Sequence, residues 1–398
     1  MRILTYSSCF PSPASSTQGI FVQRRMEAVA RHATVEVVHP VARCPILGAR
    51  GWGGWALPMS QRIGPLGVHH VPFAYVPRLL KRLDGYFYAR GVVDDLRRRV
   101  REFQPDLLDV HFAWPDGVAA WHLSRWSRLP YCLTLRGTIL PRYRIACFRK
   151  RLIPALRGAG AIISVSQEMA DVAISLGADA KRVHVIPNGV DSQLFAPQDR
   201  GAARAALGLP QDRQIVVSVA SIKPQKGQFE LIEALAMLPQ RPLLLLLGPL
   251  ADAAFGRRLE GLIRQKCLQH DVTFVAPQPP EAVARYLSAA DVAALASWNE
   301  GCPNVVLEAL SCGTPVVASE VGGIPQSVHH QHNGLLTPPR DPKHLAQTLA
   351  DALARQWSRQ AICQSVSQQT WSSVATRVYA VFEDVIAAGR PASITSPP

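Results

Sequence analysis

Two glutamates, Glu300 and Glu308, flank a stretch of the chain whose residue types could bind phosphate. Pro303 has the fixed φ that suits the first turn of a helix, and Gly313 stands where that helix would end. Backbone amides at the start of such a helix point outward at its positive end and attract anions. The amides concerned are those of Gly301, Cys302, Asn304 and Val305.

Carboxylates are unusual beside an anion site, because they repel phosphate but accept hydrogen bonds from hydroxyl groups. A ligand that carries both phosphate and hydroxyl groups would suit the amides and the carboxylates together. We infer a sugar joined to a nucleoside diphosphate, with one glutamate for each sugar ring. The alternative is that Glu300 is an exposed loop charge and Glu308 a surface residue of the helix. The spacing of the two residues does not decide between these interpretations, so the neighbouring elements matter.

The second half of the chain alternates predicted strands and helices, a pattern typical of a parallel sheet covered by helices. Strands are expected at residues 215–219, 241–247, 292–296 and 315–318. The carboxyl ends of parallel strands meet at one edge of the sheet. The residues that follow these strands are Lys223 and Lys226, Gly248, the Glu300 segment, and the pair Gly322–Gly323. Lysines in a strand-to-helix loop can neutralise a diphosphate.

The first half opens with the same alternation: a predicted strand at residues 2–6, a helix at 20–32 and a strand at 34–38. The fingerprint G-x-G-x-x-G is absent from the first turn, which argues against an NAD-binding half. Three further residues stand where ligand groups gather in such sheets, namely Gly19, His111 and Arg136. On residue type alone, a turn explains Gly19 and a structural role explains His111. Residues 43–72, rich in Gly, Pro and Trp, are expected to form a loop.

The charge of the chain is unevenly distributed. The 398 residues include 43 Lys and Arg against 29 Asp and Glu, and residues 1–180 hold 24 of the basic and 12 of the acidic side chains. The basic clusters in this half are mixed with aromatic and aliphatic residues, which suits an anionic membrane surface. Basic helices that are merely solvated are the alternative. Nucleic acid ranks third, because no helix-turn-helix, zinc finger or RNP-like motif accompanies the charge.

Several classes of protein are disfavoured by composition. The length predicts two domains. The eight cysteines form no C-x-x-C pair, which favours a reducing compartment without structural zinc. No D-x-D pair occurs, so we expect no metal in the site and no metal-bridged diphosphate. No apolar run is long enough to span a bilayer. Residues 361–388 are expected to be helical.

Five motifs, in order along the chain, are similar to those of glycosyltransferase family 4, which are retaining enzymes of the GT-B fold. They are V-I-P-N-G-V-D at 185–191, Lys226–Gly227, the segment from Glu300 to Leu310, G-T-P-V-V at 313–317 and G-G-I-P at 322–325. The resemblance extends from Met1 to about Leu349. The first loop, Gly19 to Val22 with Arg24 beyond it, resembles the bacterial cell-surface polysaccharide glycosyltransferases.

The resemblance implies an α/β protein with two Rossmann-like parallel-sheet domains facing a central cleft. Residues 1–190 would form the acceptor-binding domain, with a C-terminal helix at about 370–389 packing back on it. Residues 191–369 would form the nucleotide-sugar-binding domain, and residues 390–398 a disordered tail.

Roles for single residues also follow from the resemblance. Glu308 would bind the ribose hydroxyls and Glu300 the hydroxyls of the transferred sugar. The amides from Gly301 to Val305, with the Lys226 side chain, would hold the diphosphate, and Gly248 would line the donor site. Glu300 and Lys226 are thus expected to be catalytic.

The first half would supply the remaining site residues. His111, the third catalytic residue, would contact the sugar near its reacting carbon, and Gly19 would lie against the phosphates. Ser221 stands where the family usually has arginine, so Lys223 or Arg136 would supply the second positive charge.

The function implied is metal-independent, retaining hexosyl transfer from a nucleoside-diphosphate sugar, with UDP or GDP as the carrier and no other cofactor. The acceptor would be a lipid-linked saccharide or oligosaccharide in cell-surface polysaccharide, exopolysaccharide or glycolipid biosynthesis. The protein would be cytoplasmic and peripheral on the inner face of the membrane, and we expect it to bind no nucleic acid. The alternative is a catalytically inactive anion-binding protein on a GT-B scaffold, at a membrane or nucleic acid, in which Ser221 and Gln326 signal lost catalysis.

Overall fold

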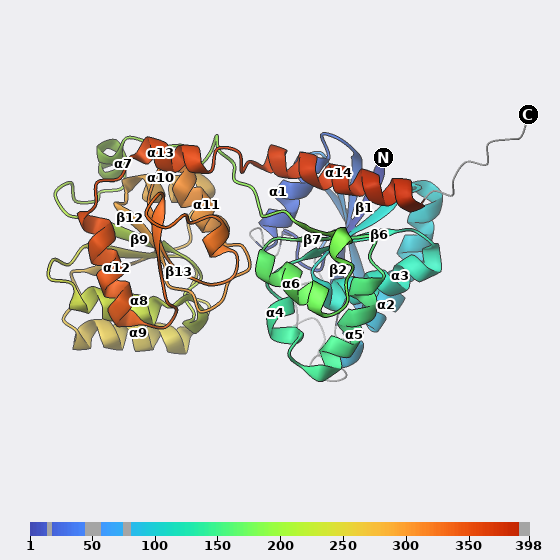
Figure 1. Ribbon diagram of the computed structural model, residues 1–398, viewed down its shortest axis with the longest axis horizontal. Helices are drawn as coiled ribbons and strands as arrows, with labels where there is room; N and C mark the ends of the chain where they lie inside the picture. Colours follow the sequence, from blue (N-terminus) through green and yellow to red (C-terminus); the bar gives the residue numbers. More distant parts are fainter. Residues whose placement is uncertain (14–17, 44–56, 75–80, 390–398) are drawn as a thin grey trace, which may run out of the picture. The chain divides into compact units, whose positions relative to one another are not determined.

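The computed structural model describes residues 1–13, 18–43, 57–74 and 81–389 of the chain (Figure 1). The chain forms two compact units. The first comprises Met1–Asn188 together with Trp371–Pro398, and the second comprises Gly189–Thr370. Each unit is built on its own sheet with helices on both faces, so the predicted pair of parallel α/β domains is confirmed.

The sheet of the first unit has the strand order β3-β4-β2-β1-β5-β6-β7-β8. All neighbours are parallel except β3 and β4. The strands are β1 (Arg2–Tyr6), β2 (Thr34–Arg43), β3 (Ser60–Ile63), β4 (Leu66–Ala74), β5 (Leu107–His111), β6 (Tyr131–Leu135), β7 (Ala161–Ser164) and β8 (Val183–Val185).

The prediction of a loop over residues 43–72 was wrong for its second part. The hairpin of β3 and β4 adds to the edge of β2, and β4 pairs with β2 from Glu36 opposite Gly67 to Arg43 opposite Ala74. Leu66 and Val68 are buried with a period of two, which is the strand signal. Residues 44–56, which hold most of the glycines and tryptophans, lie outside the described residues.

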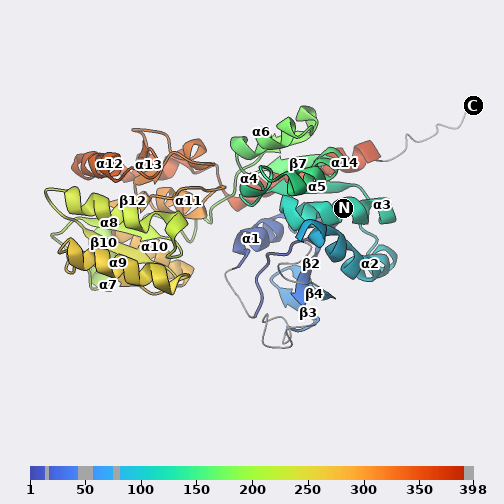
Figure 2. The same cartoon turned by 90° about the horizontal axis from the view of Figure 1, so that it is seen from below.

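Helices cover both faces of this sheet. On one face, α1 (Ile20–Val29) and α14 (Trp371–Gly389) lie side by side and pack on strand residues such as Ile3, Val37 and Leu107 (Figure 1). On the other face are α2 (Asp84–Glu102), α3 (Val118–Ser127), α4 (Ile139–Arg142), α5 (Ala146–Arg157) and α6 (Gln167–Ser175) (Figure 2).

The helix expected over residues 361–388 is in fact two helices that belong to different units. The first is α13 (Arg359–Ser365) in the second unit, and α14 begins at Trp371 in the first unit. Both helices carry apolar residues with helical spacing, so the pattern alone does not show the break between them.

The sheet of the second unit has the order β11-β10-β9-β12-β13-β14, with every neighbouring pair parallel. The strands are β9 (Ile215–Val219), β10 (Leu243–Leu247), β11 (Val272–Val275), β12 (Val292–Leu295), β13 (Val316–Ser319) and β14 (Gly334–Thr337). The five leucines of β10 alternate between two cores: Leu243, Leu245 and Leu247 face one, and Leu244 and Leu246 the other.

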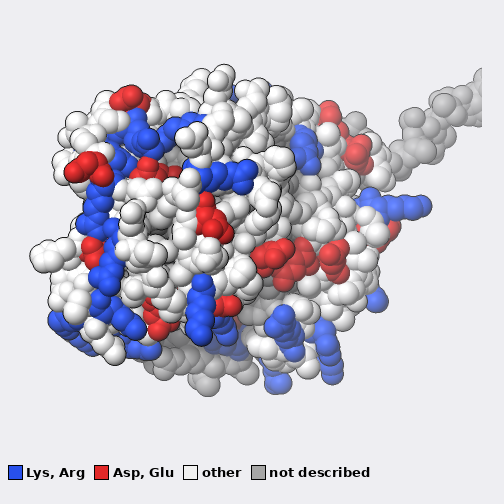
Figure 3. All heavy atoms as spheres, turned by 60° about the vertical axis from the view of Figure 1, so that its left-hand side comes forward, with Lys and Arg blue, Asp and Glu red and all other residues white. Residues whose placement is uncertain are grey.

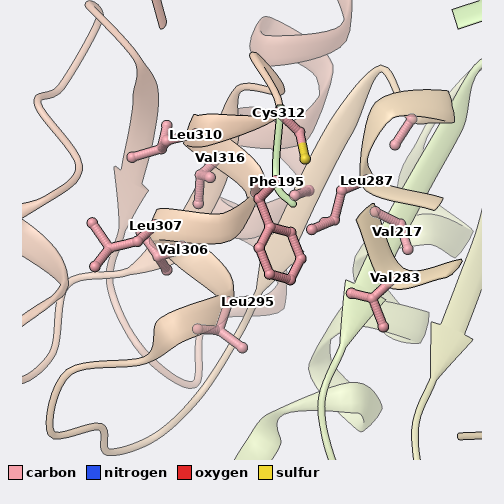
Figure 4. Packing of buried hydrophobic residues seen from close by; sticks show 14 of the residues in the cluster. Phe195, Val217, Val283, Leu287, Leu295, Val306, Leu307, Leu310, Cys312 and Val316 are labelled. Atoms are coloured by element: carbon pink, nitrogen blue, oxygen red, sulfur yellow. The ribbon is translucent and has the colours of Figure 1, made fainter. Parts of the chain in front are cut away.

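Each core lies beneath its own layer of helices. One layer contains α8 (Gln228–Met237), α9 (Ala253–Gln265) and α12 (Pro342–Ala354), and the other α10 (Pro280–Ala289), α11 (Asn304–Ser311) and α13. Figure 4 shows the core that contains Leu243, Leu245 and Leu247, in which the ring of Phe195 lies near Leu287 of α10. Val306, Leu307 and Leu310 of α11 belong to the same core. Burial of such side chains stabilises by about 1.5–3 kcal/mol each, which fixes α11 against the sheet.

The surface of the second unit carries both signs of charge. Figure 3 brings forward the side of Figure 1 where α7 (Arg200–Ala206), α9 and α12 lie, and on it Lys and Arg form a band while Asp and Glu form separate groups. None of the helices that the structure describes is long and apolar enough to cross a bilayer.

Candidate functional site

In the second unit, sheet topology brings together two loops that are distant in sequence. The chain runs from β9 outward to β10 and β11, then returns to place β12 on the other side of β9. The loops after β9 and β12 therefore leave the same edge in opposite directions, and ligands bind at such switch points in α/β sheets. The first loop carries Lys226 and the second carries Glu300.

These two side chains form an ion pair. Lys226 Nζ lies 2.5 Å from Glu300 Oε1, and the Ser297 hydroxyl donates to the same oxygen at 2.7 Å. The two side chains are only 22% and 10% exposed, so the pair is largely shielded from water. The sequence indicated both residues as ligand contacts but did not indicate that they bind each other.

Two glycines allow the surrounding loops to approach so closely. Gly227 has φ +68°, and a Cβ there would lie 1.9 Å from the carbonyl oxygen of Ala296, at the end of β12. Gly322 has φ +59°, and a Cβ there would lie 1.9 Å from the carbonyl oxygen of Glu300. Both backbones thus press against the segment that delivers Glu300, which explains why the motifs contain glycine at these positions.

We expect Gly227→Ala to lower the Tm of the protein, because neither the left-handed backbone nor the contact with Ala296 accommodates a Cβ. Gly261→Ala is the matched control, since a Cβ at this position in α9 meets nothing within 4 Å and alanine favours a helix by about 0.5–1 kcal/mol. Differential scanning calorimetry on both variants provides the measurement. A Gly227→Ala variant with an unchanged Tm would contradict the described loop geometry.

The helix that follows Glu300 begins as the sequence indicates. Pro303 is its N-cap and makes no side-chain capping bond, while the amide of Gly323 donates to the carbonyl of Gly301 at 2.8 Å. Because Val306, Leu307 and Leu310 face the core, Glu308 lies half-buried on the remaining face of α11. Cys302, Asn304 and Glu308 each have further interactions within the protein.

The other predicted donor residues lie at the same edge. Gly248 directly follows β10, with its backbone against the carbonyl of Ala220. Lys223 is half-buried in the Lys226 loop and its carbonyl accepts from the Lys226 amide at 3.0 Å.

Sequence reasoning missed a support for the Glu300 loop. The indole Nε1 of Trp298 donates to Glu230 on α8 at 2.8 Å, and its amide donates to the carbonyl of Gln225 at 3.0 Å. Arg340 lies over the indole ring at 4.3 Å, within cation–π range. A tryptophan two residues before Glu300 is the signal that could have indicated this support.

In the first unit the switch point lies between β1 and β5, and His111 ends β5. The His111 ring is fully buried. Its Nε2 lies 3.0 Å from Asp109 Oδ2, and its Nδ1 lies 3.2 Å from Arg136 Nη2. A guanidinium only donates, so Nδ1 is the acceptor and Nε2–H donates to Asp109. Burial and the nearby arginines lower the pKa of His111 to about 4, although Asp109 opposes the shift, so the ring is neutral at pH 7.

The structure adds partners for His111 within the first unit, and the contact with the sugar that the resemblance implies stays a prediction. Both ring nitrogens have partners inside the first unit: one contacts Asp109 and the other contacts Arg136. Arg136 is itself buried, donates to Asn188 Oδ1 at 3.1 Å and lies over the ring of Phe21 at 4.4 Å. Arg136, the cation expected at this edge, is thus held by His111, Asn188 and Phe21.

A buried carboxylate, which the sequence did not indicate, lies nearby. Asp116 accepts from the amide and the hydroxyl of Ser8, at 2.6 and 2.7 Å, and so ties the loop after β1 to the loop after β5. Gly19 ends the β1 loop and caps α1 with φ +76°. The sequence around Asp116 is Pro-Asp-Gly, which is typical of a turn and conceals the buried role.

Burial raises the pKa of Asp116 from 3.8 to about 7. A raised carboxyl pKa stabilises the folded state below pH 4, and this contribution is lost as the pH rises through about 7. We therefore expect Asp116→Asn, which keeps the shape and an acceptor oxygen, to raise the Tm relative to wild type at pH 8 but not at pH 4. Calorimetry at both pH values tests this, with Asp94→Asn on the exposed face of α2 as the control. A Tm difference independent of pH would refute the assignment.

The predicted site residues therefore fall into two groups. Those of the first unit are Gly19, His111 and Arg136, and those of the second are Lys223, Lys226, Gly248, Glu300, Gly301, Cys302, Asn304, Val305 and Glu308. Within the described ranges, no three His, Cys, Asp or Glu side chains gather in a group that could hold a metal ion.

The chain matches two family models that follow each other along the sequence. Residues 29–194 match the model described as Glycosyltransferase Family 4, and residues 199–369 match the one described as Glycosyl transferases group 1. The boundary between the matches lies close to the division between the two units.

The chain is similar to several proteins that are named as glycosyltransferases. The chain is 34% identical over 306 residues to D-inositol 3-phosphate glycosyltransferase of Jonesia denitrificans, covering 70% of this chain and 71% of that protein. It is 33% identical to the protein of the same name from Mycobacteroides abscessus, of which the match covers 66%, just under two thirds. It is 29% identical over 367 residues to the putative teichuronic acid biosynthesis glycosyltransferase TuaC of Bacillus subtilis, covering 89% of each chain.

Solved structures share the fold over nearly the whole chain. Sucrose-phosphate synthase from Thermosynechococcus elongatus aligns with a TM-score of 0.81 at 25% identity, covering 98% of this chain and 100% of that one. HepE of Anabaena in complex with UDP aligns with a TM-score of 0.75 at 21% identity, covering 96% and 99%.

Proposed function

Because the chain belongs to the glycosyltransferases of the GT-B fold, with a family 4 first half and a group 1 second half, we propose that it transfers a sugar from a nucleoside-diphosphate sugar to a saccharide acceptor. The observation that carries this proposal is the shielded pair of Lys226 and Glu300 at the switch point of the second unit. A cation and a carboxylate at one edge suit a ligand in which phosphate and hydroxyl groups adjoin.

The geometry of Glu300 supports a contact with hydroxyl groups. Lys226 and Ser297 both bind Oε1, which leaves Oε2 to accept from a sugar hydroxyl. Lys226 approaches from the loop after β9, where a diphosphate would add a second anion to the same ammonium group. The start of α11 adds the positive end of a helix to this edge. Glu308, half-buried on α11, would accept from the ribose hydroxyls.

We propose that the reaction is metal-independent. As the bond between the sugar and the phosphate breaks, negative charge develops on the departing diphosphate, and Lys226 together with the amides from Gly301 to Val305 would stabilise it. We further propose that the acceptor hydroxyl attacks on the face from which the phosphate leaves, so that the anomeric configuration is retained. No carboxylate nucleophile is needed in such a step.

For the two substrates we propose a UDP or GDP sugar as the donor and a lipid-linked saccharide of cell-surface polysaccharide or glycolipid synthesis as the acceptor. The similarity to TuaC, whose description names teichuronic acid biosynthesis, supports the second part. We also propose that the protein works in the cytoplasm at the inner face of the membrane. The support for this location is the excess of basic residues in positions 1–180.

A panel of ligands tests the donor directly. Purified protein is incubated with UDP, GDP and ADP and with sugars carried by each, and the Tm and the release of free nucleoside diphosphate are measured. A ligand at a hundred times its Kd stabilises the folded state by about 2.7 kcal/mol, so one carrier should raise the Tm clearly above the others. If no carrier raises the Tm and none is released from its sugar, the donor assignment is wrong. Binding without release would instead support the inactive scaffold.

A further inference from the structure

A groove on the helical face of the first unit is not part of the site described above. It lies between α2 and α3 and has a volume of about 590 Å³. Its lining includes Tyr86, Arg90, Arg97 and Arg101 from α2 and Trp126 and Ser127 from α3. None of these residues belongs to the loops that carry the candidate active site.

The cations reach the groove because of their spacing. Tyr86, Arg90, Arg97 and Arg101 are separated by four, seven and four residues, which places them on one face of a helix. The opposite face of α2 is buried through residues such as Tyr88 and Val92. The arginines are therefore held in a line along the groove, facing away from the core.

Little negative charge opposes this line. Asp94 pairs with Arg97 at 2.9 Å, but both side chains are well exposed, so the pair contributes little. The next acid, Asp95, faces inward and binds Arg98 and Arg99. Arg90 and Arg101 take part in none of the ion pairs found among the described residues. The groove thus keeps a net positive charge.

Exposed aromatic rings surround the same groove. Tyr86 and Trp126 are each 44% exposed and Phe87 is 39% exposed. The ring of His122 bridges them, at 5.4 Å from the ring of Tyr86 and 5.8 Å from that of Trp126. Half-exposed aromatic rings next to arginines suit the boundary between lipid headgroups and acyl chains, where the rings enter the boundary and the guanidinium groups bind phosphate.

We propose that the groove between α2 and α3 binds the phosphates of an anionic phospholipid bilayer and docks the first unit on the membrane. Charge complementarity supports this occupant, since three arginines line the groove and the first 180 residues carry the excess charge of the chain. The aromatic rings favour lipid over nucleic acid, because they form one cluster with His122 and are not spaced along the groove as a row of base-stacking platforms. Docking does not require the transfer reaction.

The test is vesicle co-sedimentation of the full chain without sugar nucleotide. Vesicles of phosphatidylcholine are compared with vesicles that also contain phosphatidylglycerol, for wild type and for the triple variant Arg90→Gln, Arg97→Gln, Arg101→Gln. Each cation close to an anionic surface raises the affinity for that surface about fivefold. The triple variant should therefore bind the anionic vesicles on the order of a hundredfold more weakly. The control removes three exposed cations from α9 and the residue that follows it in the second unit, with Arg257→Gln, Arg264→Gln and Lys266→Gln.

Several outcomes would overturn the proposal. Wild type that does not bind the anionic vesicles, a control variant that loses as much binding as the groove variant, or tighter binding to a DNA oligonucleotide than to vesicles would each do so. A Trp126→Ala variant gives a second measure, and it should weaken vesicle binding without changing the net charge. Release of nucleoside diphosphate by the groove variant should equal that of wild type, so failure of docking and failure of the proposed reaction would be seen in separate assays.

Discussion

Replacing Lys226 by methionine should lower kcat/KM by about 10²- to 10³-fold, the usual loss when one group that stabilises developing negative charge is removed. Lys226 is the cation of the loop after β9, and its ammonium group already lies 2.5 Å from a carboxylate at the site. Methionine keeps the length and the apolar stem of the side chain but removes the charge. The expected loss of kcat/KM therefore comes from weaker stabilisation of the departing diphosphate and not from a change in the shape of the loop. Steady-state release of nucleoside diphosphate measures it.

Two further variants separate catalysis from stability. Lys266→Met, in the exposed turn after α9, removes the same charge far from the edge of the sheet and should leave kcat/KM unchanged. Lys226→Met leaves the Glu300 carboxylate without its cation and should therefore also lower the Tm. The double variant Lys226→Met, Glu300→Gln removes the charge of that carboxylate, so it should restore the Tm without restoring turnover. If Lys226→Met turned over the donor as fast as Lys266→Met, the proposed role of Lys226 would be wrong.

Much of the second unit could be predicted because local rules determine it. Strands of apolar residues alternate with helices, and each loop after a strand must reach one edge of a parallel sheet. The loops that carry Lys226, Gly248 and Glu300 were therefore assigned to one edge correctly. The ion pair between Lys226 and Glu300 could not be predicted, because it depends on β12 lying next to β9, and a sheet order is a long-range property of the chain.

The first unit was harder to predict for a related reason. His111 and Arg136 stand at strand ends in the sequence. Nothing local indicates that the Nδ1 atom of His111 accepts from the guanidinium of Arg136. The buried positions of Asp109 and Asp116 were also hidden, since aspartate is usually exposed and the Pro-Asp-Gly sequence around Asp116 is typical of a turn. Buried polar networks depend on which neighbours satisfy them, and these neighbours come from several strands and helices.

Removal of the charge on Asp109 should cost the first unit on the order of 3–5 kcal/mol of unfolding free energy, as is usual when one partner of a buried charge network is lost. The Asp109 carboxylate is fully buried, accepts from Thr5 at 3.1 Å and from His111 at 3.0 Å, and attracts the buried guanidinium of Arg25. Although burial raises its pKa, His111, Arg25 and Thr5 together lower it, so the group is ionised at neutral pH.

Asp109→Asn keeps the shape of the side chain and one acceptor oxygen, so the expected loss comes from the charge alone. The variant leaves Arg25 buried with no nearby anion, and two of its guanidinium nitrogens, Nε and Nη2, already have no hydrogen-bond partner among the described residues. Adding Arg25→Met removes that cation. The double variant should therefore be more stable than Asp109→Asn alone. Hydrogen exchange of the β1 and β5 amides under native conditions measures the stability of the first unit in each variant. Strictly additive effects of the two substitutions would show that Arg25 and Asp109 are not coupled, and would refute this account of how the cations at the first switch point are held.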